Sequence, residues 1–203
     1  MSIHCFHNDA APPQMGARDN QIFSALIPDA SATTRTQIAK TLRAFGEPAL
    51  RFAAERGTQV RPLGRGERYA EASPALVRLG IDVDAWPAPP AGLFVVEERR
   101  VYIRSRSAMT IGHEFGHALD CALGGGVYHS GIDPAIRAAI GAARQFVTPY
   151  AASGLDEYFA ECVRAWVEAN DPASAWPAVN RERLQRLDPA MHGIVKSIFD
   201  GFA

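Results

Sequence analysis

The sequence predicts a single α+β domain with a small β-sheet in the middle of the chain, helices on both sides in sequence, and a mostly helical C-terminal half. Three observations predict this fold class. The chain has 203 residues, of which 47% are hydrophobic, and this suits one domain with its own core. Strand-like segments are short and confined to residues 58–104. Helical periodicity dominates on either side of them, and the sequence contains no internal repeat.

Residues 1–32 are expected to form an irregular N-terminal arm, because they contain several prolines and little hydrophobic periodicity. His4, Cys5 and His7 in this arm could bind a metal. A solvent-exposed tail is the better interpretation, because no further ligand lies nearby in the sequence. The folded domain is therefore expected to comprise residues 33–203.

The elements before the sheet follow from hydrophobic spacing and from helix-ending residues. Hydrophobic residues at intervals of three and four predict a helix from Thr33. Pro48 suits the first turn of a second helix, which Gly57 ends. Residues 58–63 have the composition of a short strand, and Pro62 restricts that strand to an edge or places it at the strand's end.

A short helix and a hairpin complete the middle of the chain. Ser73 suits an N-cap, Pro74 suits the first helical position, and Gly80 ends the helix. Two apolar stretches around a charged turn predict a β-hairpin over residues 92–104. The segments expected to be helical after Ser107 are 108–123, 134–147, 154–169 and shorter helices from about residue 180 to the end.

Composition excludes several classes of function. The 21 basic and 22 acidic residues give a net charge of −1, which argues against a broad electrostatic interaction with nucleic acid or with an anionic membrane. Three cysteines are too few for a disulfide-stapled secreted scaffold. No signal peptide and no apolar run of about 20 residues is visible, so we expect a cytoplasmic protein. Export by a route without a cleaved signal remains open.

The most informative segment is His113-Glu114-x-x-His117, within a stretch that we expect to be helical. At about 100° per residue, the two histidines lie about 40° apart on one face, close enough to bind one metal ion. Glu114 is rotated by about 100° from His113, so it can face a metal-bound water without binding the metal. Apolar residues cover the opposite face. A zinc site is favoured over a surface helix with a coincidental motif.

A catalytic zinc ion needs a third protein ligand, and several residues downstream are candidates. His129 follows three glycines, and a flexible loop fixes a ligand poorly. Cys121 lies one turn after His117, but a small buried side chain is the better interpretation, because a thiolate there would compete with the open coordination position. A histidine six residues after His117 is absent, since Leu123 occupies that position.

Glu157 and Glu161 are the better candidates. They lie four residues apart on one face of the helix expected over 154–169, for which Ser153 would be the N-cap. One carboxylate could bind zinc while the other supports a histidine N–H. The alternative is a solvent-exposed stripe, because Arg164 and Glu168 share that face. The sequence leaves these two interpretations open.

These motifs carry a family resemblance. The His113–Asp120 segment His-Glu-Phe-Gly-His-Ala-Leu-Asp, followed by Tyr150 and then Glu157-Tyr-Phe-Ala-Glu161, resembles the catalytic domain of anthrax lethal factor and of the bacterial Pro-Pro endopeptidases. The resemblance covers roughly residues 58–200. It implies zincin-like helices beside the small sheet and a zinc metalloendopeptidase of the gluzincin type. The segments that set substrate choice in those relatives are not recognisable, and neither is the secretion signal of the Pro-Pro endopeptidases.

The resemblance implies a role for each matching residue. His113, His117 and Glu157 would bind one Zn²⁺ ion, and Glu114 would act as the general base. Tyr150 would stabilise the oxyanion or protonate the leaving group, and Glu161 would support a zinc ligand from behind. No other cofactor is implied.

Two functions are compatible with this sequence. The first is a zinc-dependent endopeptidase whose peptide or protein substrate binds along a sheet edge near residues 92–104. The alternative is a zinc-stabilised binding or regulatory module without significant peptidase activity. Glu114 and Tyr150 count against the alternative, because a purely structural zinc site needs neither residue.

Overall fold

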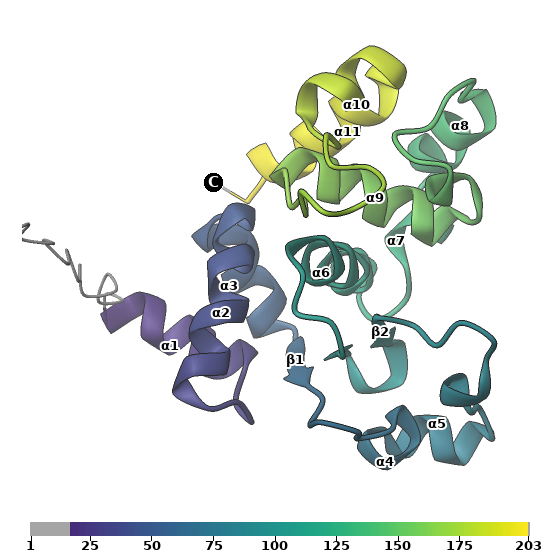
Figure 1. Ribbon diagram of the computed structural model, residues 1–203. Helices are drawn as coiled ribbons and strands as arrows, with labels where there is room; N and C mark the ends of the chain where they lie inside the picture. Colours follow the sequence, from purple (N-terminus) through teal and green to yellow (C-terminus); the bar gives the residue numbers. More distant parts are fainter. Residues whose placement is uncertain (1–16, 203) are drawn as a thin grey trace, which may run out of the picture.

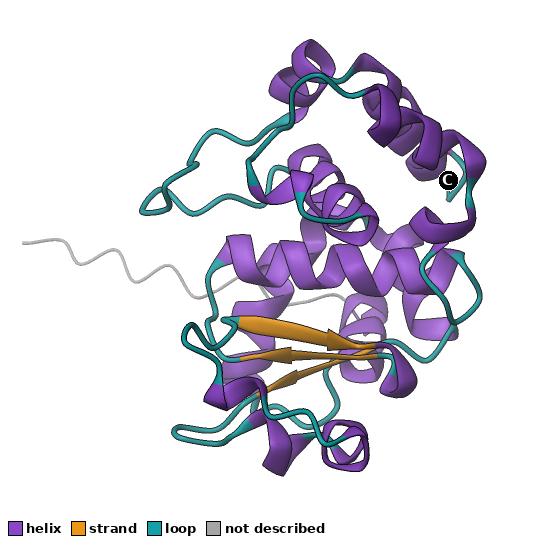
Figure 2. Ribbon diagram, turned by 90° about the vertical axis from the view of Figure 1, so that its right-hand side faces the viewer, coloured by secondary structure: helices purple, strands orange, loops and turns teal. Residues whose placement is uncertain are grey.

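The computed structural model describes residues 17–202. Its centre is a long helix, α6 (Ala108–Leu123), with a small sheet on one side and a group of C-terminal helices on the other (Figures 1 and 2). The predicted α+β class is confirmed. Residues 1–16 and 203 lie outside the described residues, and with them His4, Cys5 and His7, for which a solvent-exposed tail was preferred over metal binding.

The sheet has three strands, β1 (Gln59–Pro62), β2 (Gly92–Val95) and β3 (Arg100–Ile103), in the order β1-β3-β2. The predicted strand and hairpin are therefore both present. β3 is central; it runs parallel to β1 and antiparallel to β2, so that β1 and β2 are the edges. Pro62 is the last residue of the edge strand β1, and its nitrogen faces away from β3, so its missing N–H costs no bond in the ladder, which continues with the Leu63 amide donating to the Ile103 carbonyl.

Helices precede and follow the strands along the chain. Those before and within the sheet region are α1 (Ala17–Leu26), α2 (Ala32–Leu42), α3 (Glu47–Glu55), α4 (Tyr69–Ala72) and α5 (Pro74–Leu79). Those after α6 are α7 (His129–Ile132), α8 (Pro134–Ala142), α9 (Leu155–Val167), α10 (Arg181–Leu187) and α11 (Pro189–Asp200).

Helix α1 corrects the expectation of an irregular arm. The side chains of Phe23, Leu26 and Ile27 are buried in the main core, so the segment that begins at residue 17 is part of the folded domain. Their spacing of three and one residues is a helical signal, but the stretch is short and lies between proline-containing segments.

Other differences are small and concern helix ends. Helix α8 stops at Ala142, five residues before its predicted end. Helix α9 begins after Gly154 rather than Ser153, and the Ser153 hydroxyl instead donates to the Tyr150 carbonyl over 2.7 Å. The single-turn helices α4 and α7 are too short to produce a periodic pattern.

The packing of α6 positions the functional residues. Every residue from Thr110 to Ala122 is buried. Gly112 lies against Ala169, and Gly116 lies against the backbone of Ala160 in α9. A Cβ atom added at Gly112 would lie 2.4 Å from the Ala169 Cβ, and one added at Gly116 would lie 3.0 Å from the Ala160 Cα. The two glycines therefore let α9 and the residues after it approach α6 closely.

Between residues 17 and 202, no helix combines the length and the apolar character that crossing a bilayer requires.

We predict that Gly112→Ala destabilises the protein by about 1–2 kcal/mol, because neither alanine side chain can rotate to relieve the overlap. Gly193→Ala is the matched control: Gly193 lies within α11, and an added Cβ would meet nothing within 4 Å. That variant should be more stable than the wild type by up to about 1 kcal/mol, through helix propensity alone. Urea unfolding measures both. Equal stability of the two variants would contradict the conclusion that the contact with Ala169 requires glycine at position 112.

Candidate metal centre

Two histidines of α6 and one glutamate of α9 meet between the helices. The Nε2 atoms of His113 and His117 lie 3.1 Å apart. Glu157 Oε2 lies 3.0 Å from the first of these nitrogens and 3.3 Å from the second. His113, His117 and Glu157 thus form the one group of three such side chains among residues 17–202 that could hold a metal ion.

The spacing of these atoms fits a metal ion. In tetrahedral zinc sites with ligands about 2.0–2.1 Å from the ion, neighbouring ligand atoms lie about 3.3 Å apart. His113 Nδ1 lies 2.9 Å from Glu161 Oε1, and because an ionised carboxylate can only accept, Nδ1 carries a proton and Nε2 is the ring nitrogen left for a metal ion. Glu157 Oε2 is buried and has no hydrogen-bond partner within the described residues. A cation satisfies all of these converging atoms.

The electrostatics of the site also favour a bound cation. Burial alone would lower the pKa of His113, but the carboxylates of Glu157 and Glu161 outweigh it and raise this pKa to about 10. For Glu157, burial opposes ionisation, yet the two imidazoles hold the pKa of its carboxyl well below the usual range. The position between these residues favours positive charge, which a proton or a metal ion can supply.

Glu161 lies behind His113 and is fully engaged. Its Oε1 accepts from His113 Nδ1 and, over 2.8 Å, from Arg164 Nε. Its Oε2 accepts from the Thr148 hydroxyl over 2.6 Å and from Arg164 Nη2 over 2.8 Å. Burial alone would raise the pKa of Glu161, but the guanidinium and the imidazole lower it to about 2. No comparable support exists for His117, whose buried Nδ1 has no partner within residues 17–202.

From the sequence, Arg164 could belong to a solvent-exposed stripe of α9. It is only 1% exposed, and Glu161 is 4% exposed, whereas Glu168 is exposed. The stripe interpretation is therefore wrong for the two central residues. A Glu–Arg pair at i, i+3 within the otherwise apolar stretch 158–167 was the available signal.

Glu114 lies beside the candidate metal ligands and next to the edge strand β2. A Cβ at Gly92 would lie 2.5 Å from the Glu114 Cγ, so only glycine lets β2 pass this close to the carboxylate. Glu114 is buried, and burial raises the pKa of its carboxyl, an effect that the two neighbouring imidazoles partly oppose. A raised pKa makes the carboxylate a stronger base than an exposed glutamate.

Tyr150 stands at the mouth of the site, in the short 3₁₀ helix η4 (Tyr150–Ala152) that precedes α9. Its hydroxyl donates to Glu157 Oε1 over 2.9 Å, and its ring centroid lies 5.4 Å from that of His113. Burial and the Glu157 carboxylate both raise the pKa of the phenol, so the hydroxyl keeps its proton. The side chain is 49% exposed and can therefore meet a ligand.

The structure does not bring the other candidate ligands to this group. Cys121 is buried on a different part of α6 and lines a separate small cavity beside Arg99. His129 is placed in α7, where its Nε2 lies 3.4 Å from Asp133 Oδ2.

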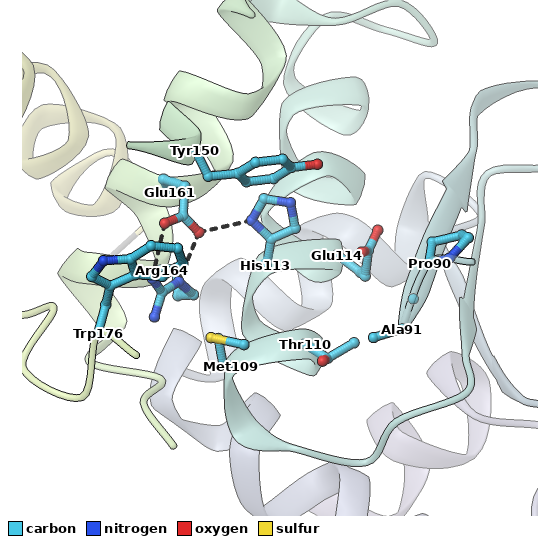
Figure 3. A pocket seen from close by; sticks show the side chains of 11 residues that line it. Pro90, Ala91, Met109, Thr110, His113, Glu114, Tyr150, Glu161, Arg164 and Trp176 are labelled. Atoms are coloured by element: carbon cyan, nitrogen blue, oxygen red, sulfur yellow. Dashed lines mark hydrogen bonds and ion pairs between the residues drawn. The ribbon is translucent and has the colours of Figure 1, made fainter. Parts of the chain in front are cut away.

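A cavity of about 220 Å³ opens beside His113, one of the three candidate metal ligands (Figure 3). His113, Glu114 and Tyr150 form one part of its wall, and Pro90 and Ala91 form the side next to the sheet. On the side of α9 it is bounded by Arg164 and by Trp176, which belongs to the loop between α9 and α10. The site thus combines a potential metal centre, a buried acid, a tyrosine hydroxyl and an adjacent cavity.

Comparison with known proteins adds a fold relationship. No protein-family model and no curated protein matches the sequence. The solved structure of the Pro-Pro endopeptidase from Paenibacillus alvei is similar, with a TM-score of 0.61 and 16% sequence identity over 87% of this chain and 99% of that chain. At this identity the similarity establishes a shared fold.

Proposed function

We propose that this protein is a zinc-dependent endopeptidase. The observation that carries the proposal is the convergence of His113 Nε2, His117 Nε2 and Glu157 Oε2 within 3.0–3.3 Å, with the buried carboxylate of Glu114 beside them. The shared fold supports it, because the similar solved structure is that of an endopeptidase.

Zinc is the metal that this donor set fits best. Two imidazoles and one carboxylate are a ligand set typical of catalytic zinc sites, and three protein ligands leave a coordination position open. When bound, zinc supplies a Lewis acid that polarises a carbonyl group and activates a water molecule. Glu161 and Arg164 contribute by holding His113 in the tautomer that presents Nε2 to the ion.

The other residues supply proton transfer and charge stabilisation. Glu114, with its raised pKa, would take a proton from the attacking water and return it to the departing amine. The protonated hydroxyl of Tyr150 would donate to the oxyanion or to the leaving group. For this, the hydroxyl must exchange its hydrogen bond to Glu157 Oε1 for one to the substrate.

The free edge of β2 is the proposed binding site for the peptide backbone. The amides of Gln59 and Leu63 in and after β1 donate to the carbonyls of Arg99 and Ile103, so alternate residues of β3 face β1. The backbone groups of the other two residues of β3, Arg100 and Tyr102, therefore face β2, where the register places them opposite Val95 and Leu93. The backbone N–H and C=O groups of Gly92 and Phe94 consequently point away from β3, toward the outer edge of the sheet. Gly92 lines the cavity, so a peptide added there as a strand would pass the metal ligands.

We predict that Glu114→Gln lowers kcat/KM for peptide cleavage by about 10²–10⁴, because it removes the proton acceptor and leaves the shape unchanged. Zinc content, measured by atomic absorption, should be that of the wild type. Glu55→Gln, at an exposed position in α3, should cleave normally. Substrates come from a peptide library with a mass-spectrometric readout. Normal cleavage by Glu114→Gln would refute the mechanism, and a zinc-loaded wild type without cleavage would favour the binding module.

We predict that Glu157→Ala weakens zinc binding more than Glu161→Gln does. The first change removes a ligand atom, whereas the second alters a support, a change that typically costs 10–100-fold in metal affinity. Glutamine is chosen at position 161 because alanine would leave the guanidinium of Arg164 buried without its partner. Competition with a chromophoric chelator measures both affinities. Equal affinities in the two variants would contradict the assignment of Glu157 as the third ligand.

We predict that a bound peptide analogue slows amide exchange at Gly92. Hydrogen exchange followed by NMR, on the zinc-loaded Glu114→Gln variant, measures the effect. The amide of Val60 on the opposite edge of the sheet is the control and should be unaffected. Protection at Val60 without protection at Gly92 would show that β2 is not the binding edge.

A further inference from the structure

The loop between α9 and α10 covers one side of the cavity and is held mainly at its two ends, where Ala169 and Val179 are buried in the main core. It carries Trp176, which lines the cavity and is 40% exposed. Within the loop, the amides of Ala173 and Trp176 are bound only by the nearby side chains of Asp171 and Ser174. The two ends of the loop are joined by Asn170, whose Nδ2 donates to the carbonyl of the buried Val179 over 2.7 Å, and by Arg181, whose Nε donates to the Trp166 carbonyl.

Asn170 is in turn held by the arginine behind the metal centre. Arg164 Nη1 donates to Asn170 Oδ1 over 3.2 Å and to the Ala169 carbonyl over 3.4 Å. The other nitrogens of the same guanidinium bind Glu161, which holds His113. A planar guanidinium can serve both directions at once because its donors have a fixed fork geometry. One buried side chain therefore connects the loop with a proposed zinc ligand.

We propose that Trp176 is a specificity-determining residue that selects substrates with a large apolar side chain next to the cleaved bond, and that Asn170 and Arg164 are the residues that position it. This inference rests on the proposed endopeptidase function.

The lining of the cavity identifies the class of side chain. Pro90, Ala91 and Trp176 offer apolar surface, and Met109 and Thr110 of α6 complete the wall between them. The charged groups nearby are Glu114, which the chemistry uses, and the pair Glu161–Arg164, whose charges are mutually satisfied. A charged substrate side chain would lose its hydration without gaining a partner.

The size and the location of the cavity also indicate a single large side chain as its occupant. The cavity of about 220 Å³ corresponds to roughly seven water molecules at about 30 Å³ each. This is below the range of about 300–1,000 Å³ that is typical of sites for whole small-molecule ligands. It suits one large side chain. Because His113 and Glu114 form part of the wall, that side chain belongs to a residue adjacent to the reacting carbonyl.

The experiment uses zinc-loaded full-length protein and the hydroxamates of N-acetylated leucine, alanine and aspartate, with binding measured by calorimetry. The hydroxamate group binds zinc, so each probe places its side chain next to the metal whatever the natural substrate is. We expect the leucine probe to bind at least about tenfold more tightly than the alanine probe, and the aspartate probe to bind most weakly.

Variants then test each residue. Trp176→Ala should reduce the preference for leucine over alanine to less than about twofold, and Trp176→Phe should restore most of it. Trp86→Ala is the matched control: Trp86 is 52% exposed and is not part of the cavity wall, so the preference should be unchanged. Asn170→Ala should reproduce the loss seen with Trp176→Ala at unchanged zinc content, and it should raise KM for apolar peptides while kcat changes little.

The outcomes separate this inference from the proposed function. Equal binding of the leucine and alanine probes to the zinc-loaded wild type, or an unchanged preference in Trp176→Ala, would overturn the role of Trp176. An unchanged preference in Asn170→Ala would overturn the positioning role. A leucine preference that depends on Trp176, in a protein that cleaves no peptide, would support the pocket and refute the peptidase. A protein that binds no zinc would overturn both.

Discussion

The close approach of α9 to α6 is the constraint on which the site depends. Gly112 and Gly116 precede the two histidines of α6 by one residue each, and both glycines face α9 or the residue that follows it closely. With side chains at these positions the helices would separate, and Glu157 Oε2 could not lie within 3.3 Å of both imidazoles. The glycines inside the His-Glu-x-x-His segment and directly before it are therefore part of the site's geometry, although they touch no ligand.

The ion pair between Glu161 and Arg164 is buried near the same interface. The cost of burying its charges explains why both side chains make several hydrogen bonds. A buried carboxylate and guanidinium lose much hydration, which their attraction repays only when their hydrogen bonds are satisfied. Here both oxygens of Glu161 accept two hydrogen bonds, and Arg164 has partners on both of its terminal nitrogens. Such a pair contributes little net stability, but it holds His113 in one orientation.

Local signals predicted most of the fold, because hydrophobic spacing, prolines and glycines act over a few residues. Helix α6 and the hairpin of β2 and β3 lie where these signals placed them. What depended on long-range packing could not be predicted in the same way. The burial of Arg164 and the position of Trp176 in the cavity wall result from contacts between segments that are distant in the sequence. That His113 and His117 share one face followed from their spacing, and the choice of Glu157 over Glu161 came from the family resemblance. Glu161 was separable from an exposed stripe only once its surroundings were known.

Because Arg164 contacts both Glu161 and Asn170, the orientation of His113 and the shape of the cavity depend on partly shared residues. A change at Arg164 affects both the support of His113 and the anchoring of Asn170, so the two properties are coupled at that residue. A change at Trp176 reaches only the cavity wall, since its side chain makes no hydrogen bond to the metal-site residues within the described structure. With a net charge of −1 and a largely apolar cavity, the proposed enzyme would select its substrates by shape rather than by charge. The position at which shape can change without disturbing the proposed zinc ligands is therefore the loop between α9 and α10.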